Sequence, residues 1–209
     1  MTKPFHFILT VSCLGLAACA GVDVNEPRPY AGYFEQKKLT SPAPKSFDVC
    51  RGYGCVSRDR VSLSPAQWTK ATAPLRQTIT NAPAERAAIA KSIGLMERIV
   101  GKKTGTAVDV AGTYDTLGPH QLDCVDESTN ATVYMAMMEE AGLFKFHKTT
   151  RPTARVPLFV AQGPHQTAAL VDIKTGERYA VDSWFHDNGH PAEIVPMGDW
   201  KMGWTPQKD

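Results

Sequence analysis

Three residues in the second half of the chain have types and an order that could carry out acyl transfer: Cys124, His165 and Asp182. A cysteine becomes a strong nucleophile once it has lost its proton, and a neighbouring histidine is the usual base. A carboxylate that accepts a hydrogen bond from the other ring nitrogen fixes the tautomer of that histidine. Whether the three side chains meet depends on the elements that carry them.

Cys124 lies in the stretch HQLDCVDESTN, residues 120–130, with Asp123, Asp126 and Glu127 close by. Such a thiol can be half of a disulfide, a metal ligand, a buried apolar residue or a nucleophile. A redox thiol is a further alternative, and it would require a resolving cysteine nearby. Each alternative predicts different partners elsewhere in the chain.

The pattern around Cys124 predicts a helix from about Asp123, whose carboxylate can cap it, to about Ala141, with Gly142 as the stop. One stripe of that helix contains Cys124, Ser128, Ala131, Met135 and Met138. The thiol would lie in the first turn, where free backbone N–H groups and the helix dipole stabilise a thiolate. The adjacent acids act in the opposite direction and raise the pKa of the thiol. Helix position alone therefore does not separate a nucleophile from a buried structural cysteine.

Downstream of this helix the sequence predicts strands at residues 156–161, 167–173 and 178–185. Lys174-Thr-Gly176 forms a hairpin turn between the last two. His165 begins one of these paired strands, and Asp182 lies toward the far end of the other. The hairpin should therefore bring His165 and Asp182 together at one edge of an antiparallel sheet.

The three residues follow one another along the chain: a cysteine at a helix start, a histidine at the start of a strand and an aspartate toward the end of the next strand. By this order of residues and elements, the chain resembles the transglutaminase-like branch of the papain-like fold. The resemblance covers about residues 121–185 and does not extend to residues before about 100. Its motifs are Asp123-Cys124-Val-Asp-Glu127, Pro164-His165-Gln-Thr-Ala-Ala-Leu-Val and Tyr179-Ala-Val-Asp182-Ser-Trp.

The resemblance implies an α+β fold, with N-terminal helices packed on an antiparallel sheet and the cysteine-bearing helix at its edge. It implies Cys124 as the nucleophile, His165 as general base and acid, and Asp182 as the orienting acid. Acids beside the cysteine also occur in the family. The expected activity is cleavage or transfer of an amide through a thioester intermediate. If water attacks the thioester, the protein is a peptidase or amidase; if an amine attacks it, the protein is a transglutaminase. A peptide or protein amide in the cell envelope is the expected substrate.

The oxyanion donors expected at such a site are the backbone N–H of Cys124 and the side chain of Gln121 or His120. Gln121 could equally be a loop residue that contacts backbone. The alternative function, from a different class, is a non-catalytic binding lipoprotein that keeps the fold and uses the cleft for a peptide or protein partner.

Two other cysteines, Cys50 and Cys55, bracket the glycine-rich spacer Arg-Gly-Tyr-Gly. In an oxidising compartment a disulfide between them is the expected outcome. A zinc half-site is the rival interpretation, but no second CxxC motif and no helical HxxxH motif supplies further ligands. We therefore expect a disulfide, no metal and no cofactor, which leaves Cys124 unpaired.

The N-terminus resembles a bacterial lipoprotein signal peptide. Lys3 precedes an apolar run over residues 7–16 that is too short to span a bilayer, and Leu16-Ala17-Ala18-Cys19 looks like a lipobox. Residues 1–18 would then be removed and Cys19 lipidated, with a plain signal peptide as the alternative. Ala20 in place of an acid favours the outer membrane, facing the periplasm, with lipid as the only membrane anchor.

Residues 19–46 contain four prolines and few aliphatic residues and read as a tether, although Tyr30, Tyr33 and Phe34 could dock on the domain. Residues 47–209 are expected to form a single domain. One predicted helix begins at Ser64-Pro65, and a second one covers residues 83–100.

The charge of the chain is nearly balanced, with 23 Lys+Arg and 21 Asp+Glu residues. No basic run with interleaved aromatics occurs, so nucleic acid is not an expected partner.

Overall fold

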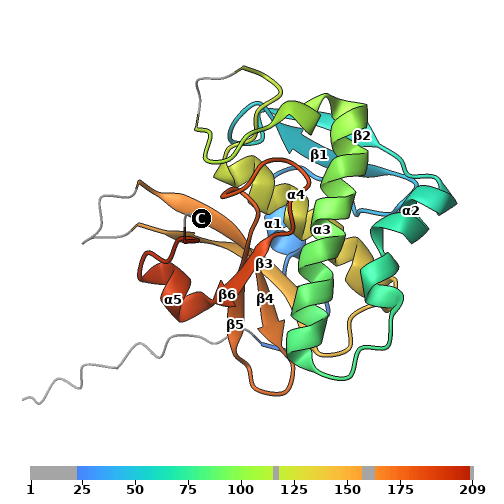
Figure 1. Ribbon diagram of the computed structural model, residues 1–209, viewed down its shortest axis with the longest axis vertical. Helices are drawn as coiled ribbons and strands as arrows, with labels where there is room; N and C mark the ends of the chain where they lie inside the picture. Colours follow the sequence, from blue (N-terminus) through green and yellow to red (C-terminus); the bar gives the residue numbers. More distant parts are fainter. Residues whose placement is uncertain (1–22, 115–117, 157–162, 208–209) are drawn as a thin grey trace, which may run out of the picture.

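The computed structural model describes residues 23–114, 118–156 and 163–207, and it has a mixed α+β fold (Figure 1). The helices are α1 (Ala31–Gln36), α2 (Pro65–Ala71), α3 (Ala82–Thr104), α4 (Cys124–Glu140) and α5 (Met197–Lys201), with 3-10 turns η1 (Ala73–Arg76) and η2 (Thr106–Val108). The strands are β1 (Phe47–Arg51), β2 (Ser57–Val61), β3 (His147–Arg155), β4 (His165–Asp172), β5 (Arg178–Asp182) and β6 (Glu193–Pro196).

The strands form two antiparallel sheets. β3, β4, β5 and β6 are neighbours in that order in the larger sheet, and β1 and β2 form a separate hairpin. α4 contacts β3 and β4 on one side and β1 on another, so the helix joins the two sheets. In Figure 1 the long α3 runs vertically to the right of the larger sheet, and α4 crosses behind it. The expected combination of helices with an antiparallel sheet is confirmed at this level.

α4 is the most buried helix. Fourteen of its residues are buried, and Met135 and Met138 are fully inaccessible to solvent. Tyr134 packs edge-on against Phe47 of β1, with ring centroids 6.2 Å apart. A helix that is buried on all sides belongs to the interior of a domain. α4 is thus a central helix, and the expected position at the edge of the sheet describes only its first turn, which lies near the start of β4.

The start of α4 is set by its cap, as the sequence predicts. Asp123 is the N-cap, and its Oδ1 accepts from the backbone N–H groups of Val125 at 3.0 Å and Asp126 at 2.8 Å. Asp126 completes a capping box by accepting from the Asp123 N–H. The start of α2 is confirmed in the same way by a capping box between Ser64 and Gln67.

The predicted end of α3 is wrong by one turn. The helix continues through Gly101 and stops at Thr104, where Gly105 adopts a left-handed conformation with φ 84°. Gly101 has a different role, because a Cβ there would lie 2.9 Å from the Ala107 backbone nitrogen. The glycine permits the return of the chain after α3 and does not end the helix.

The β4–β5 hairpin follows the predicted order. His165 is the first residue of β4 and Asp182 is the last residue of β5, and Gly176 has φ 73° in the turn between the strands. Of the strand predicted at residues 156–161, residues 157–161 lie outside the described residues. β3 was not predicted, because it is polar, contains Pro152 and has a register shift between Thr150 and Thr153.

Part of the expected tether belongs to the folded domain. Tyr30, Tyr33 and Phe34 are buried in the main core through α1, as their clustering suggested. The Tyr33 hydroxyl lies 2.7 Å from Thr129 Oγ1 of α4. Because these aromatics gain more from burial than from exposure, the folded part begins before residue 47. No helix within the described ranges is long and apolar enough to cross a membrane.

Close packing of α3 against the loop after β5 gives a stability prediction. A Cβ at Gly94 would lie 2.7 Å from the His190 carbonyl oxygen and 2.8 Å from that of Gly189. We expect Gly94→Ala to lower the free energy of unfolding by about 1–3 kcal/mol, because backbone must move. Urea unfolding measures this. Gly32→Ala in α1 is the control, because a Cβ at Gly32 would have no atom within 4 Å, and its free energy of unfolding should equal or slightly exceed that of the parent. An equal loss in both variants would contradict the prediction.

Candidate active site

Cys124 is the first residue of α4 and has a free, buried thiol that is 8% exposed. The backbone N–H of Gln166, the residue after His165, hydrogen-bonds to this thiol. The Gln166 side chain also donates to Ser128 Oγ of α4 at 2.7 Å and to the Tyr33 hydroxyl at 3.1 Å. These bonds hold the start of β4 against the first turns of α4. They bring the predicted nucleophile next to the strand that begins with the predicted base.

His165 and Asp182 form the predicted pair. His165 Nε2 lies 2.7 Å from Asp182 Oδ2, and both side chains are buried. Because an ionised carboxylate can only accept, Nε2 carries the proton in this contact. The other nitrogen, Nδ1, is buried and has no hydrogen-bond partner among the described residues. In the neutral ring Nδ1 is therefore an acceptor with a free lone pair.

The electrostatics of Cys124 favour the protonated thiol. Burial raises its pKa to about 11, and the charges of Asp123 and Asp182 act in the same direction. The backbone N–H groups of Gln166 and of Cys124 itself partly oppose this. At neutral pH the resting group is a thiol, so a base has to remove its proton before or during any attack.

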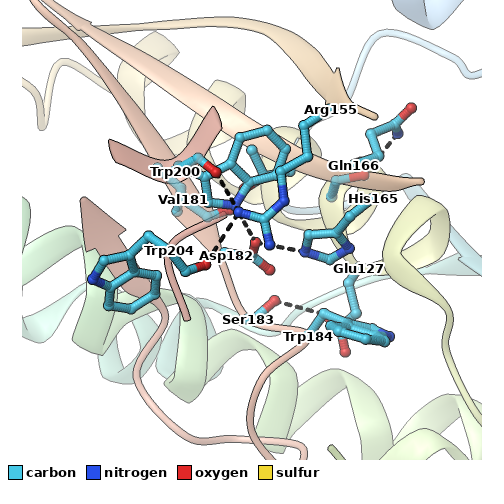
Figure 2. A network of polar contacts seen from close by, with 12 residues as sticks. Glu127, Arg155, His165, Gln166, Val181, Asp182, Ser183, Trp184, Trp200 and Trp204 are labelled. Carbon is cyan, nitrogen blue, oxygen red and sulfur yellow. Dashed lines mark hydrogen bonds and ion pairs between the residues drawn. The ribbon is translucent and has the colours of Figure 1, made fainter. Parts of the chain in front are cut away.

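Asp182 has a second donor that the sequence analysis missed. The indole Nε1 of Trp200, in α5, donates to the same Oδ2 atom at 2.7 Å. Figure 2 shows His165, Asp182 and Trp200 grouped with Arg155. A tryptophan near the C-terminal end of a sequence gives no signal for this role.

Aromatic side chains surround His165. Its ring centroid lies 4.6 Å from that of Trp184, 5.4 Å from that of Phe185 and 5.6 Å from that of Trp200. Tyr114 packs on Trp184 at 5.0 Å and is 51% exposed. Burial raises the pKa of Tyr114, and the charge of a Cys124 thiolate would act in the same direction. His165 thus lies among aromatic rings, and the outermost of them, Tyr114, is exposed.

Gln121 is not available as an oxyanion donor. Its Nε2 donates to the Val108 carbonyl at 2.8 Å and its Oε1 accepts from the Val110 N–H at 3.0 Å. The interpretation of Gln121 as a loop residue that contacts backbone is the one that the geometry supports. His120 is exposed and its ring lies against Gly105. The Cys124 backbone N–H, in the first turn where no intrahelical acceptor exists, remains a candidate donor.

Cys50 and Cys55 form a disulfide, as predicted. The loop between them docks on the first turn of α4, because the N–H groups of Tyr53 and Cys55 each donate to Asp126 at 2.7 Å. The Gly54 N–H donates to Asp123 Oδ2 at 2.8 Å. The acids beside the nucleophile are thus structural acceptors for the cap and for this loop. Nothing in their geometry directs them toward a substrate.

The next acid, Glu127, belongs to a buried cluster behind the triad. Glu127 Oε2 accepts from Ser183 Oγ at 2.6 Å (Figure 2), and Glu127 and Asp109 share a hydrogen bond. Glu97 Oε2 accepts from the Gly189 N–H at 2.9 Å. Burial raises the pKa of Glu97 to about 8 and that of Asp109 to about 6, and raises the pKa of Glu127 well above its ordinary value.

Metal binding has no geometric support in the part of the chain that the structure describes. No group of three or more His, Cys, Asp or Glu side chains there could hold a metal ion. In the carboxyl cluster of Glu97, Asp109 and Glu127, the contacts are the Gly189 N–H on Glu97, the Ser183 hydroxyl on Glu127 and the hydrogen bond between Glu127 and Asp109. His186 and His190, with stacked rings 3.8 Å apart, lie beside Glu193, which pairs with His186 Nε2 at 2.8 Å.

The carboxyl cluster predicts that stability falls as pH rises. Its groups bind protons more tightly in the folded chain than in the unfolded chain, where acids titrate near pH 4. The unfolded chain therefore loses these protons first, and the free energy of unfolding decreases from about pH 5 to about pH 8. Urea unfolding across this range measures the decrease.

Glu97→Gln should reduce this pH dependence, because an amide has no proton to lose and its oxygen can still accept from Gly189. Glu35→Gln is the matched control, since Glu35 is exposed on α1, and its pH dependence should equal that of the parent. A Glu97→Gln profile as steep as the parent profile would contradict the role of the cluster.

Comparison with known proteins gives no match. No family model, no curated protein and no solved structure is significantly similar to this chain. The function therefore has to be argued from the geometry of Cys124, His165 and Asp182.

Proposed function

We propose that the protein is an envelope-anchored thiol acyl-transfer enzyme that uses Cys124, His165 and Asp182. The observation that carries this proposal is the arrangement of His165: Nε2 is bound to Asp182 at 2.7 Å, and the unpartnered Nδ1 is on the strand whose next N–H contacts the Cys124 thiol. A tautomer fixed by a carboxylate, which leaves Nδ1 as a free acceptor on the strand that contacts the thiol, is consistent with general-base activation of a cysteine.

In the proposed reaction Nδ1 of His165 takes the thiol proton while Cys124 Sγ attacks the carbonyl carbon of an amide. The negative charge that forms on the carbonyl oxygen is stabilised by backbone N–H groups at the start of α4. The imidazolium then gives its proton to the leaving amine, the C–N bond breaks, and a thioester on Cys124 remains. Asp182 holds the ring and stabilises the imidazolium throughout.

The same residues serve two outcomes. Water attacking the thioester, with His165 as base, gives a carboxylic acid and makes the protein a peptidase or amidase. A primary amine attacking instead gives a new amide and makes the protein a transglutaminase. The aromatic surface of Tyr114 and Trp184 suits a substrate that presents an apolar group beside the scissile amide. These features agree with the proposed relationship to transglutaminase-like, papain-like enzymes.

One observation favours a non-catalytic alternative, in which the same cleft binds a peptide or protein partner. A thiol whose pKa is raised to about 11 is far less reactive than the thiolates of most cysteine enzymes. The two functions make opposite predictions for the reaction of Cys124 with an electrophile near neutral pH, because only a base beside the thiol overcomes the raised pKa.

For the location we propose a lipoprotein, with signal peptide residues 1–18 and a lipidated Cys19. The lipobox sequence Leu16-Ala17-Ala18-Cys19 carries this part of the proposal. The Cys50–Cys55 disulfide is consistent with an oxidising compartment such as the periplasm. The anchored domain would act on peptide or protein amides of the cell envelope.

Labelling with an electrophilic vinyl sulfone probe at pH 7 tests the triad. We expect rapid labelling of the parent at Cys124, loss of labelling in Cys124→Ala, and a fall of about 100-fold or more in His165→Ala, because general-base catalysis is typically worth that much. Mass spectrometry of the intact protein measures the rate and the site.

His186→Ala is the matched control, because His186 pairs with Glu193 through Nε2 at 2.8 Å much as His165 pairs with Asp182, but away from the thiol. It should label at the parent rate. Equal labelling of the parent and His165→Ala, rising only as pH approaches 11, would refute the enzyme and leave the binding function.

Lipidation has its own test. In cells fed an alkyne-tagged fatty acid, the parent chain should carry the tag and sediment with membranes. Cys19→Ala should lose both properties, while Cys13→Ala, within the expected signal peptide, should keep them. A tagged Cys19→Ala chain would rule out the lipobox assignment.

A further inference from the structure

The proposed triad rests on a fourth side chain in the C-terminal helix. Asp182 Oδ2 accepts two hydrogen bonds of 2.7 Å, one from His165 Nε2 and one from Trp200 Nε1. Asp182 is 2% exposed and Trp200 is fully buried. A buried carboxylate is costly unless donors satisfy it. Two donors in different directions at one oxygen also fix the rotation of the carboxylate about its side-chain bond.

Trp200 is itself held in one orientation. The Arg155 guanidinium lies over its ring, 4.4 Å from the centroid. Arg155 Nη1 donates to the carbonyl oxygen of Trp200 and, at 3.1 Å, to that of Trp204 (Figure 2). Arg155 ends β3 directly opposite His165 of β4 in the strand register. The strand that pairs with the histidine thus also fixes the helix that supplies the indole.

We propose that Trp200 is a positioning residue for the acyl-transfer reaction, an inference that rests on the proposed function. Its indole N–H keeps Asp182 in the orientation that accepts from His165 Nε2, so that Nδ1 stays the free acceptor beside the thiol. Arg155 maintains this contact by packing on the ring and by binding the backbone of the segment after β6. Trp200 touches no reacting atom and acts only through Asp182.

Trp200→Phe tests this role, because it keeps an aromatic ring over Arg155 and removes the indole N–H, together with part of the buried ring. We expect the maximal rate of Cys124 labelling by the vinyl sulfone to fall roughly tenfold, the equivalent of one lost hydrogen bond. The probe concentration at half-maximal rate should stay close to the parent value. The midpoint of thermal unfolding should fall by several degrees, because a buried ring is truncated, but the variant should remain folded at the labelling temperature. Trp68→Phe, in α2, is the control and should label at the parent rate.

A readout independent of activity accompanies the kinetics. In nitrogen-15 spectra of the parent, the Trp200 indole signal, identified by its loss in Trp200→Phe, should move in Asp182→Asn. The His165 Nε2–H signal should shift or exchange faster with water in Trp200→Phe and remain unchanged in Trp68→Phe.

The outcomes separate the two proposals. A parent that labels in a His165-dependent way, together with a Trp200→Phe variant that labels as fast as the parent, overturns the positioning role and leaves the enzyme. A parent that does not label overturns the enzyme. Unchanged His165 signals in Trp200→Phe overturn the positioning of Asp182 whether or not the protein is active.

Discussion

The first turn of α4 is the point on which the rest of the structure depends, and two carboxylates hold it. Asp123 and Asp126 accept hydrogen bonds from the helix N–H groups and from the loop closed by the Cys50–Cys55 disulfide. The first N–H groups of a helix have no acceptor within the helix. Here the two carboxylates of the first turn accept from these N–H groups and also from the N–H groups of the disulfide loop. Cys124 is fixed between them, at the boundary between the helix and the disulfide loop.

The polar side chains of a buried helix need hydrogen-bond partners, and several of those on α4 bond to segments that are distant in the sequence. Asn130 bonds both the N–H and the carbonyl of Cys50, Thr129 meets Tyr33 of α1, and Glu127 meets Ser183 after β5. Each pair is a directional contact in a nonpolar surrounding, so each specifies one arrangement of the elements. The site is therefore located by polar contacts as much as by the methionines that fill the core.

Local signals predicted the elements that carry the triad, because capping and alternation are encoded within a few residues. Asp123 caps its helix and His165 starts β4 where the sequence indicated, whereas β5 ends at Asp182 and not at residue 185 as predicted. What could not be predicted depends on contacts across the chain. α3 continues past Gly101, which packs against Ala107, and ends at the left-handed Gly105. The Gln121 amide is bound to loop backbone, and the bond from Trp200 to Asp182 joins residues that no periodicity relates.

The order of these segments along the chain has a consequence for biosynthesis. The helix with the thiol is made first, the proposed base and orienting acid follow on β4 and β5, and the indole comes only with α5. A growing chain thus contains its cysteine well before it contains the residues that would make the cysteine reactive. Under the proposed function, the thiol would become reactive only after β4 and β5 pack on α4 and α5 packs on β5 and β6, so unfinished chains would carry an unreactive thiol.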